Sequence, residues 1–181
     1  MIKKNLSSII NTLLFIGIFI PQFIGASEKI EKTGDILQIV IPAICLGSTI
    51  FDEKELKGNK QFFKSLITTA LITKSLKIAT RKQRPNGECC QSFPSGHTSV
   101  AFMGAAFIHK RYGWQYSIPA YVGATFVGYS RVQVDKHFIE DVIAGAAVGI
   151  LSSFYFTKPY KGFIIDITVT NGYKIYLSQT L

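Results

Sequence analysis

The 181-residue chain has few charged residues and lacks the composition of a disordered or collagen-like protein. Charged side chains make up 17% of the chain, whereas hydrophobic residues make up 48% and the mean hydropathy is +0.26. A chain this apolar leans toward membrane association, and its length suits one domain of ordinary size. The composition therefore favours a single domain with a single active site.

Cysteines are also few, and their spacing excludes the usual structural roles. Cys45, Cys89 and Cys90 have neither the CxxC pairing nor the His-x3-His partner of a structural zinc site, and they cannot build a disulfide framework. At most, Cys89 and Cys90 could form a vicinal disulfide in an oxidising compartment.

Acidic residues are scarce: the chain has 11 Asp and Glu residues and 20 Lys and Arg residues, which give a formal net charge of +9. Such an excess suits nucleic acid, anionic lipid head groups or a phosphorylated substrate. A nucleic-acid partner is disfavoured, since the basic residues are dispersed along several helix ends and no groove-reading motif is present.

The N-terminal segment predicts export or membrane insertion. Lys3 and Lys4 precede an apolar stretch over residues 9–25, and Ala26-Ser27 then leads into a charged run. This is the layout of a signal peptide cleaved after Ala26, but about 17 apolar residues also reach the lower limit for a spanning helix. Residues 1–26 are therefore a signal peptide or a first transmembrane helix, and in both cases the chain that follows crosses the inner membrane.

Five further apolar stretches predict helices, because each is long and lacks the two-residue alternation of strands. They cover residues 36–51, 62–78, 97–108, 117–128 and 138–156. If the helices alternate in direction, three lysine-rich connections lie at one end, in the positive-inside pattern. The expected fold class is an all-α bundle of about five or six helices, mostly transmembrane. A helix over residues 94–109 is short for a bilayer, which leaves a thin or soluble bundle open.

The last residues have a different character. Two runs rich in β-branched and aromatic residues flank Asn171-Gly172, a strong hairpin signal. We expect a domain over residues 27–161 and a C-terminal tail over residues 162–181, either packed or frayed, or forming a hairpin that docks on a partner.

Polar residues interrupt the apolar chain at three places, and the first of these, Pro94-Ser95-Gly96-His97, precedes a predicted helix. Ser92 or Ser95 could cap the helix, and Pro94 suits its first turn. Free N–H groups and the positive end of the helix dipole favour an anion in front of such a start, and Gly96 lets that anion approach the backbone. An ordinary helix start is the alternative.

A second polar cluster contains Ser130-Arg131, His137 and Asp141. His137 and Asp141 are four residues apart, so they share a helix face and Asp141 can hydrogen-bond one imidazole nitrogen. That bond would leave the other nitrogen free as a nucleophile and stabilise the cation formed after attack. A surface salt bridge is the alternative.

The remaining cluster supplies cations. Arg84, with Arg131, offers a planar fork that matches phosphate oxygens, and Lys77 adds a point charge. Together they could stabilise a five-coordinate phosphorus transition state. Three other cations are instead expected to form a solvated rim that touches lipid head groups: Arg81, Lys82 and Lys136.

These clusters resemble the complete signature of the type 2 phosphatidic acid phosphatase (PAP2) superfamily: Lys-x6-Arg-Pro, Pro-Ser-Gly-His and Ser-Arg-x5-His-x3-Asp. The resemblance covers roughly residues 35–160 and implies that His137 attacks phosphorus, that Asp141 orients it, and that His97 protonates the leaving alcohol and then activates water. The phosphoryl oxygens would be held by the remaining signature groups: Lys77, Arg84, Ser95, Gly96 and Arg131. No metal or other cofactor is implied, because cations and backbone dipoles already neutralise the charge.

The resemblance further implies a membrane enzyme that releases inorganic phosphate from a lipid at the periplasmic face. Only residues 86–93 separate the first two motifs, so we expect an open site suited to a bulky head group. Lipid A, phosphatidylglycerol phosphate, phosphatidate and undecaprenyl pyrophosphate are all possible substrates. The alternatives are a soluble periplasmic acid phosphatase, a vanadate-dependent haloperoxidase, for which the chain is very short, and a non-catalytic lipid-binding protein.

Overall fold

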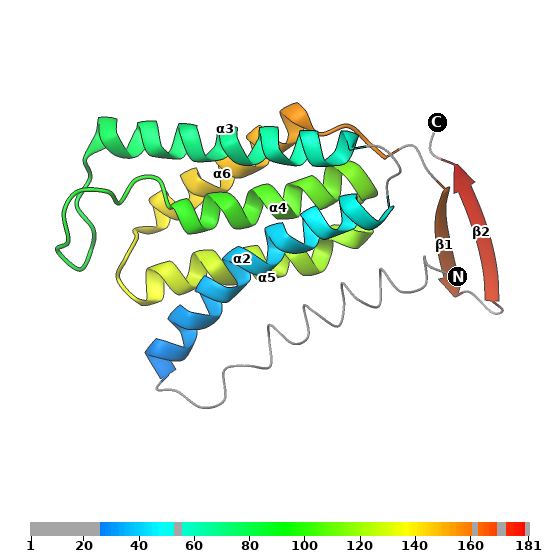
Figure 1. Ribbon diagram of the computed structural model, residues 1–181. Helices are drawn as coiled ribbons and strands as arrows, with labels where there is room; N and C mark the ends of the chain where they lie inside the picture. The colour runs from blue at the N-terminus through cyan, green and yellow to red at the C-terminus, as the bar shows by residue number, and fades with distance from the viewer. Residues whose placement is uncertain (1–25, 53–55, 161–162, 170–172, 180–181) are drawn as a thin grey trace.

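The computed structural model describes residues 26–52, 56–160, 163–169 and 173–179. This part of the chain forms five α-helices, which confirms the all-α class (Figure 1). They are α2 (Ala26–Asp52), α3 (Lys57–Thr80), α4 (Gly96–Tyr112), α5 (Trp114–Gln133) and α6 (Ile139–Phe156). The predicted signal peptide or first transmembrane helix lies almost wholly outside the described residues.

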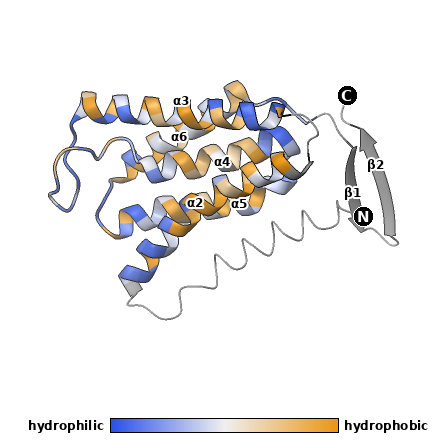
Figure 2. Ribbon diagram, in the orientation of Figure 1, coloured by the Kyte–Doolittle hydropathy of each residue, from blue (hydrophilic) through white to orange (hydrophobic). Residues whose placement is uncertain are grey.

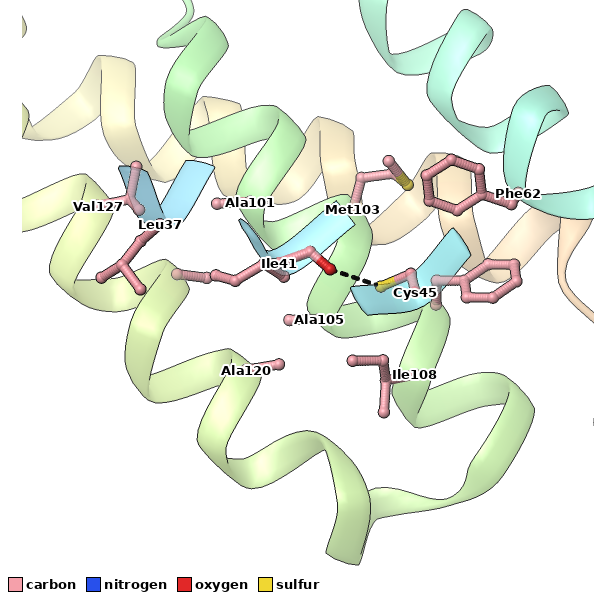
Figure 3. Packing of buried hydrophobic residues seen from close by; sticks show 12 residues of the cluster. Leu37, Ile41, Cys45, Phe62, Ala101, Met103, Ala105, Ile108, Ala120 and Val127 are labelled. Carbon is pink, nitrogen blue, oxygen red and sulfur yellow. Dashed lines mark hydrogen bonds between the residues drawn. The ribbon is translucent and has the colours of Figure 1, made fainter. Parts of the chain in front are cut away.

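Helix α4 is the centre of the bundle and packs against each of the other four helices. Its side chains Ala101, Met103 and Phe107 are fully buried. Figure 3 shows the core around Ile41 and Cys45 of α2, whose thiol donates to the Ile41 carbonyl at 3.1 Å. The core also includes residues of α2, α3 and α5: Leu37, Phe62, Ala120, Ala124 and Val127. Because α4 packs tightly against four other helices, its N-terminus has a fixed position relative to the ends of those helices.

Two glycines allow α6 to approach α4 closely. A Cβ atom on Gly149 would lie 2.2 Å from the Ser99 carbonyl oxygen, and one on Gly145 would lie 2.5 Å from the Ser95 carbonyl oxygen. Small residues four positions apart are the usual means by which helix backbones come into contact. The start of α6 is therefore held against the start of α4.

The outer surface of the bundle carries apolar stripes at four-residue spacing, which places their members on one face of each helix. Exposed residues form such a stripe on α3, another on α5 and another on α6. The stripes contain Phe63, Ile67 and Leu71; Trp114, Ile118 and Val122; and Ile139, Ile143, Leu151 and Tyr155. Figure 2 shows hydrophobic residues along the helices. Large exposed apolar faces indicate contact with lipid or protein.

Two of the described helices are long and apolar enough to cross a membrane: α2, over Ser27–Ile50, and α6, over Ile139–Phe156. The helices alternate in direction, so the connections over residues 81–95 and 134–138 lie at one end of the bundle, at the left in Figure 1. We call this the site end. The described parts of the lysine-rich connections lie at the other end, as the sequence predicted.

Two helix boundaries differ from the sequence prediction. Helix α2 begins at Ala26, ahead of the apolar stretch at residue 36, and an ion pair between Lys32 and Glu28 (2.7 Å) joins successive turns of this added part. Helix α5 continues to Gln133, so Arg131 lies in its last turn and not in the expected connection. Arg131 is buried there, and burial of its side chain requires the helical backbone to continue.

Strands near the C-terminus pair as a hairpin, which is one of the two alternatives that the sequence left open. Strands β1 (Phe163–Val169) and β2 (Tyr173–Gln179) pair antiparallel, with Phe163 opposite Gln179 and Val169 opposite Tyr173. The Asn-Gly pair that predicted the turn lies outside the described residues. Cys89 and Cys90, in the connection at the site end, are paired as a vicinal disulfide.

Candidate active site

Backbone hydrogen bonds bring the three polar clusters together at the site end. The Asn86 amide donates to the Asp135 carbonyl (3.0 Å), and the Ser95 amide donates to the Asp141 carbonyl (2.9 Å). Within the last cluster, the His137 amide donates to the Arg131 carbonyl (3.2 Å). Because the first two bonds join segments far apart in the sequence, the convergence on which the sequence prediction depended is present in the structure.

His137 lies in the short connection before α6, and its side chain is buried. Burial lowers the pKa of the imidazole, and the positive charges of Lys77 and Arg84 lower it further, to about 4. The Asp141 carboxylate acts in the opposite direction but does not outweigh them. His137 is therefore neutral near pH 7, which is the form a nucleophile requires.

Asp141 is fully buried and accepts several hydrogen bonds, but none from His137. Its Oδ2 accepts from the Ser92 hydroxyl (2.5 Å) and from the Phe138 amide (3.0 Å), while 3.8 Å separates it from His137 Nδ1. The predicted hydrogen bond between Asp141 and His137 was therefore wrong for this structure. The carboxylate has other donors, although it remains close enough to His137 to stabilise a positive charge on the ring.

Lys82 was also interpreted wrongly from the sequence, because it belongs to the site and not to a solvated rim. Its Nζ lies 2.8 Å from Asp141 and 2.7 Å from Glu140, and 4.4 Å from the centre of the Phe138 ring. Partial burial lowers the pKa of Lys82, but hydrogen bonds to Asp141 and Glu140 outweigh that effect and raise it overall. Lys82 is thus a charged partner of the buried carboxylate.

Of the two other cations assigned to the rim, Lys136 has a side-chain partner, whereas Arg81 is exposed and contributes through its backbone. Lys136 forms an ion pair with Glu31 of α2. Arg81 follows the last residue of α3 in the left-handed conformation (φ 45°), and its amide donates to the Lys77 carbonyl. This end of the bundle is therefore organised by ion pairs and caps to a greater extent than the sequence indicated.

Lys77, in the last turn of α3, lies beside the start of α4. Its Nζ donates to the Gln91 carbonyl (2.5 Å), and a Cβ atom on Gly96 would lie 3.9 Å from its Cε. The charge of Lys77 acts on both His97 and His137. The two imidazoles therefore share one cation. Arg84, the other cation near His137, forms an ion pair with Glu88 (2.5 Å).

Ser95, one of the two caps that the sequence offered, is the N-cap of α4. Its buried hydroxyl oxygen accepts from the Thr98 hydroxyl (2.9 Å) and lies 3.5 Å from the Thr98 amide. Gly96 is the first residue of the helix, and the helix N-terminus is where an anion is favoured. Contacts of Ser95 and Gly96 with a phosphoryl group stay predictions.

Arg131 and His97 share a partner that the sequence did not single out. Asp35 of α2 places Oδ1 2.9 Å from Arg131 Nη1 and 3.3 Å from His97 Nε2. Arg131 also donates to the Glu31 carbonyl (2.9 Å) and to the Ser130 hydroxyl (3.0 Å). The only signal for Asp35 was an acidic residue immediately before an apolar stretch.

The lack of a side chain at Gly34 allows α2 to approach Ser130 and Arg131 closely. A Cβ atom there would lie 2.1 Å from the Ser130 hydroxyl oxygen and 2.9 Å from Arg131 Nη2. Helix α2 thus reaches the site through its backbone at Gly34 and its carboxylate at Asp35. Among the described residues, no group of three or more His, Cys, Asp and Glu side chains is arranged to hold a metal ion.

The arrangement combines a buried neutral histidine, a second histidine, and clustered cations at a helix N-terminus. A family model described as the PAP2 superfamily matches residues 60–163, a range that includes all three polar clusters. The chain belongs to the PAP2 superfamily. The family predicted from the three motifs is thereby confirmed.

Two proteins named lipid A 1-phosphatases resemble this chain over different extents. It is 35% identical over 141 residues to a lipid A 1-phosphatase of Porphyromonas gingivalis, covering 72% of this chain but only 31% of that protein. It is 28% identical over 180 residues to a lipid A 1-phosphatase of Helicobacter pylori strain 26695, covering 88% of this chain and 90% of that protein.

Two solved PAP2 structures share the fold. The first transmembrane PAP2-type phosphatidylglycerolphosphate phosphatase of Bacillus subtilis aligns with a TM-score of 0.58 and 27% identity, over 86% of this chain and 84% of that one. LpxE of Aquifex aeolicus aligns with a TM-score of 0.56 and 21% identity, over 83% of this chain and 84% of that one. Both likenesses confirm the predicted helical architecture.

Proposed function

We propose that this PAP2 protein is a membrane lipid phosphatase that hydrolyses a phosphomonoester or terminal pyrophosphate through a phosphohistidine intermediate. The observation that carries the proposal is the convergence of the signature residues at one end of an apolar bundle. The exposed apolar stripes on α3, α5 and α6 support the placement of the helices in a lipid bilayer, because these side chains would otherwise face water.

In the first step, the neutral His137 ring attacks phosphorus while the bond from phosphorus to the lipid oxygen breaks. His97 donates a proton to that oxygen, so the lipid leaves as an alcohol or a shorter phosphate. In the second step, His97 takes a proton from water as the water attacks the phosphohistidine. Inorganic phosphate leaves, and both imidazoles return to their starting state.

The cations and the helix start stabilise the charge that develops on the phosphoryl oxygens. Lys77, Arg84 and Arg131 supply positive charge, and the Ser95 and Gly96 groups lie at the N-terminus of α4. Asp141, 3.8 Å from His137 Nδ1, stabilises the positive charge on the phosphorylated ring. The chain's own groups thus supply the nucleophile, the acid and the charge stabilisation.

Lipid A is the substrate that the relatives favour, since proteins of two organisms that resemble this chain are named lipid A 1-phosphatases. The short connection between the first two motifs also supports an open site that accepts a large head group. Phosphatidylglycerol phosphate is the second candidate, because the B. subtilis structure at 27% identity is a phosphatidylglycerolphosphate phosphatase.

The site end is assigned to the periplasm of the bacterial inner membrane. The opposite end carries the lysine-rich connections, and positive residues near helix ends favour the cytoplasm. The substrate phosphate would therefore be removed at the outer face of the inner membrane.

The first prediction concerns substrate choice. The detergent-purified protein, incubated with lipid A, phosphatidylglycerol phosphate, phosphatidate and undecaprenyl pyrophosphate in parallel, is expected to release phosphate fastest from lipid A. Phosphate release and mass spectrometry of the lipids measure this. The absence of release from all four lipids would contradict the proposed function. Activity extracted by osmotic shock without detergent would instead favour the soluble alternative.

The second prediction concerns pH. Because burial and nearby cations lower the pKa of His137 to about 4, the nucleophile stays neutral well below the ordinary histidine range. The acidic limb of kcat/KM, which reports the free enzyme, is therefore expected at about pH 4 and not at about 6.5. Stopped assays on a soluble phosphomonoester from about pH 3 to 8 measure the limb, and a midpoint at about 6.5 would contradict the burial argument.

A further inference from the structure

Asp35 contributes to the site from a helix that the family match does not include. The match begins at residue 60, whereas Asp35 lies near the start of α2 and contacts two signature residues with a single oxygen atom. The distances are 2.9 Å to Arg131 Nη1 and 3.3 Å to His97 Nε2. The Asp35 side chain is about half exposed, but the Oδ1 atom that makes both contacts is itself buried.

The charges around His97 explain why a carboxylate is needed there. Burial lowers the pKa of His97, and three cations lower it further: Arg131 from α5, Lys136 from the connection before α6, and Lys77 from α3. Asp35 is the anion that opposes these effects, and it offsets them only in part. Glu31, one turn earlier on α2, is already engaged by Lys136.

A general acid must hold its proton before the leaving group departs. In the proposed reaction His97 donates that proton, yet the cations that bind phosphate also make the imidazolium less stable. An adjacent carboxylate resolves this conflict, because it stabilises the charged ring without occupying both ring nitrogens. Among the described contacts, none engages His97 Nδ1.

We propose that Asp35 is a positioning residue that orients His97 and stabilises its protonated form, the form that acts as the general acid. This inference rests on the proposed function. The Asp35 carboxylate, whose Oδ1 lies 3.3 Å from Nε2, stabilises the imidazolium as an ion pair, and Nδ1 donates its proton to the leaving oxygen as the bond to phosphorus breaks. The neutral ring stays beside Asp35, and its Nδ1 accepts a proton from water in the second step. Asp35 thus supports His97 as a carboxylate supports a catalytic histidine in other hydrolases.

The leaving group provides the decisive test. A lipid alkoxide needs protonation, whereas p-nitrophenolate leaves readily without an acid, so loss of the acid affects the two substrates differently. Asp35→Asn is expected to lower kcat/KM by roughly 10- to 100-fold on the preferred lipid, the range for a lost interaction with a charged group, and by less than about threefold on p-nitrophenyl phosphate. The alkaline limb of kcat/KM is expected to move to lower pH, because the protonated ring has lost its anion.

Two further variants define the control and the rescue. Asp35→Glu keeps the charge and is expected to recover most of the lipid activity and the alkaline limb. Glu28→Gln makes the same chemical change on α2, at an exposed pair with Lys32, and is expected to behave as the unaltered protein. Thermal unfolding of all variants shows whether any loss comes from the fold.

A histidine titration by NMR tests the same inference without turnover. The chain has three histidines, so His97 can be assigned by substitution. The midpoint of its titration is expected to fall in Asp35→Asn, because the carboxylate that raises the His97 pKa is gone, and an unchanged midpoint would overturn the inference.

The activity outcomes separate the inference from the proposed function. If the unaltered protein hydrolyses no lipid, the proposed function fails, and the NMR titration still decides whether Asp35 stabilises protonated His97. Equal losses on both substrates would assign Asp35 a structural role only. A lower KM and a higher kcat in Asp35→Asn would instead show that the Asp35 carboxylate competes with the substrate phosphate. Equal losses on both substrates, or this gain, would each overturn the positioning role.

Discussion

His137→Gln is expected to reduce phosphate release by on the order of 10⁴-fold or more, the largest effect of any single substitution in this chain. Glutamine cannot form the phosphohistidine, so the two-step route is lost and not merely slowed. The fold should remain, because none of the described contacts of the core depends on the His137 ring. Phosphate release from the preferred lipid and circular dichroism measure the two quantities.

His109→Gln is the matched control for this substitution. His109 lies near the opposite end of α4, where its ring contacts Tyr121 and Phe154. The same change there is expected to leave activity within about threefold, since stabilisation of the developing phosphoryl charge does not extend to that end of the bundle. A His137→Gln protein as active as His109→Gln would remove His137 from the role of nucleophile.

Gly149→Val is expected to destabilise the protein by at least about 3 kcal/mol, at the upper end of the cost of overpacking. The added Cβ would lie 2.2 Å from the Ser99 carbonyl oxygen and 2.7 Å from the Met103 amide nitrogen. Both atoms belong to the backbone of α4, so no side-chain movement relieves the clash. Thermal unfolding in detergent should show a midpoint lower by about 6–12 °C.

Gly47→Val is the control, because it places the same residue in helix α2 where nothing lies within 4 Å. Its cost should be limited to helix propensity, about a few tenths of a kcal/mol in either direction. Equal unfolding midpoints for the two variants would mean that contact between α4 and α6 does not determine stability. Loss of activity in Gly149→Val beyond its loss of stability would show that the helix contact also aligns the site.

Much of the site could be predicted from the sequence, because its chemistry is concentrated in short motifs. Residues 94–97 are contiguous, and His137 and Asp141 lie four positions apart, so local spacing alone places them at helix starts. The alternation of lysine-rich and polar connections then predicted which clusters share an end of the bundle. The helices themselves followed from long apolar stretches, whose composition indicates burial or lipid contact regardless of tertiary detail.

The remaining features depend on contacts that no local pattern encodes. Lys82 and Asp141 are 59 residues apart, and Asp35 and Arg131 come from helices that meet only in the folded bundle. The spacing of His137 and Asp141 permitted a hydrogen bond but did not determine it, because Ser92 and Phe138 compete for the same carboxylate oxygen. Long-range competition of this kind is visible only once the backbone is placed.

Helix α2 contributes Asp35 but precedes the segment that defines the superfamily. Exchanging this helix between homologues would therefore alter the surroundings of the catalytic acid while every signature residue stays unchanged. Chimaeras with transplanted α2 segments offer a route to enzymes with shifted working pH or altered leaving-group tolerance.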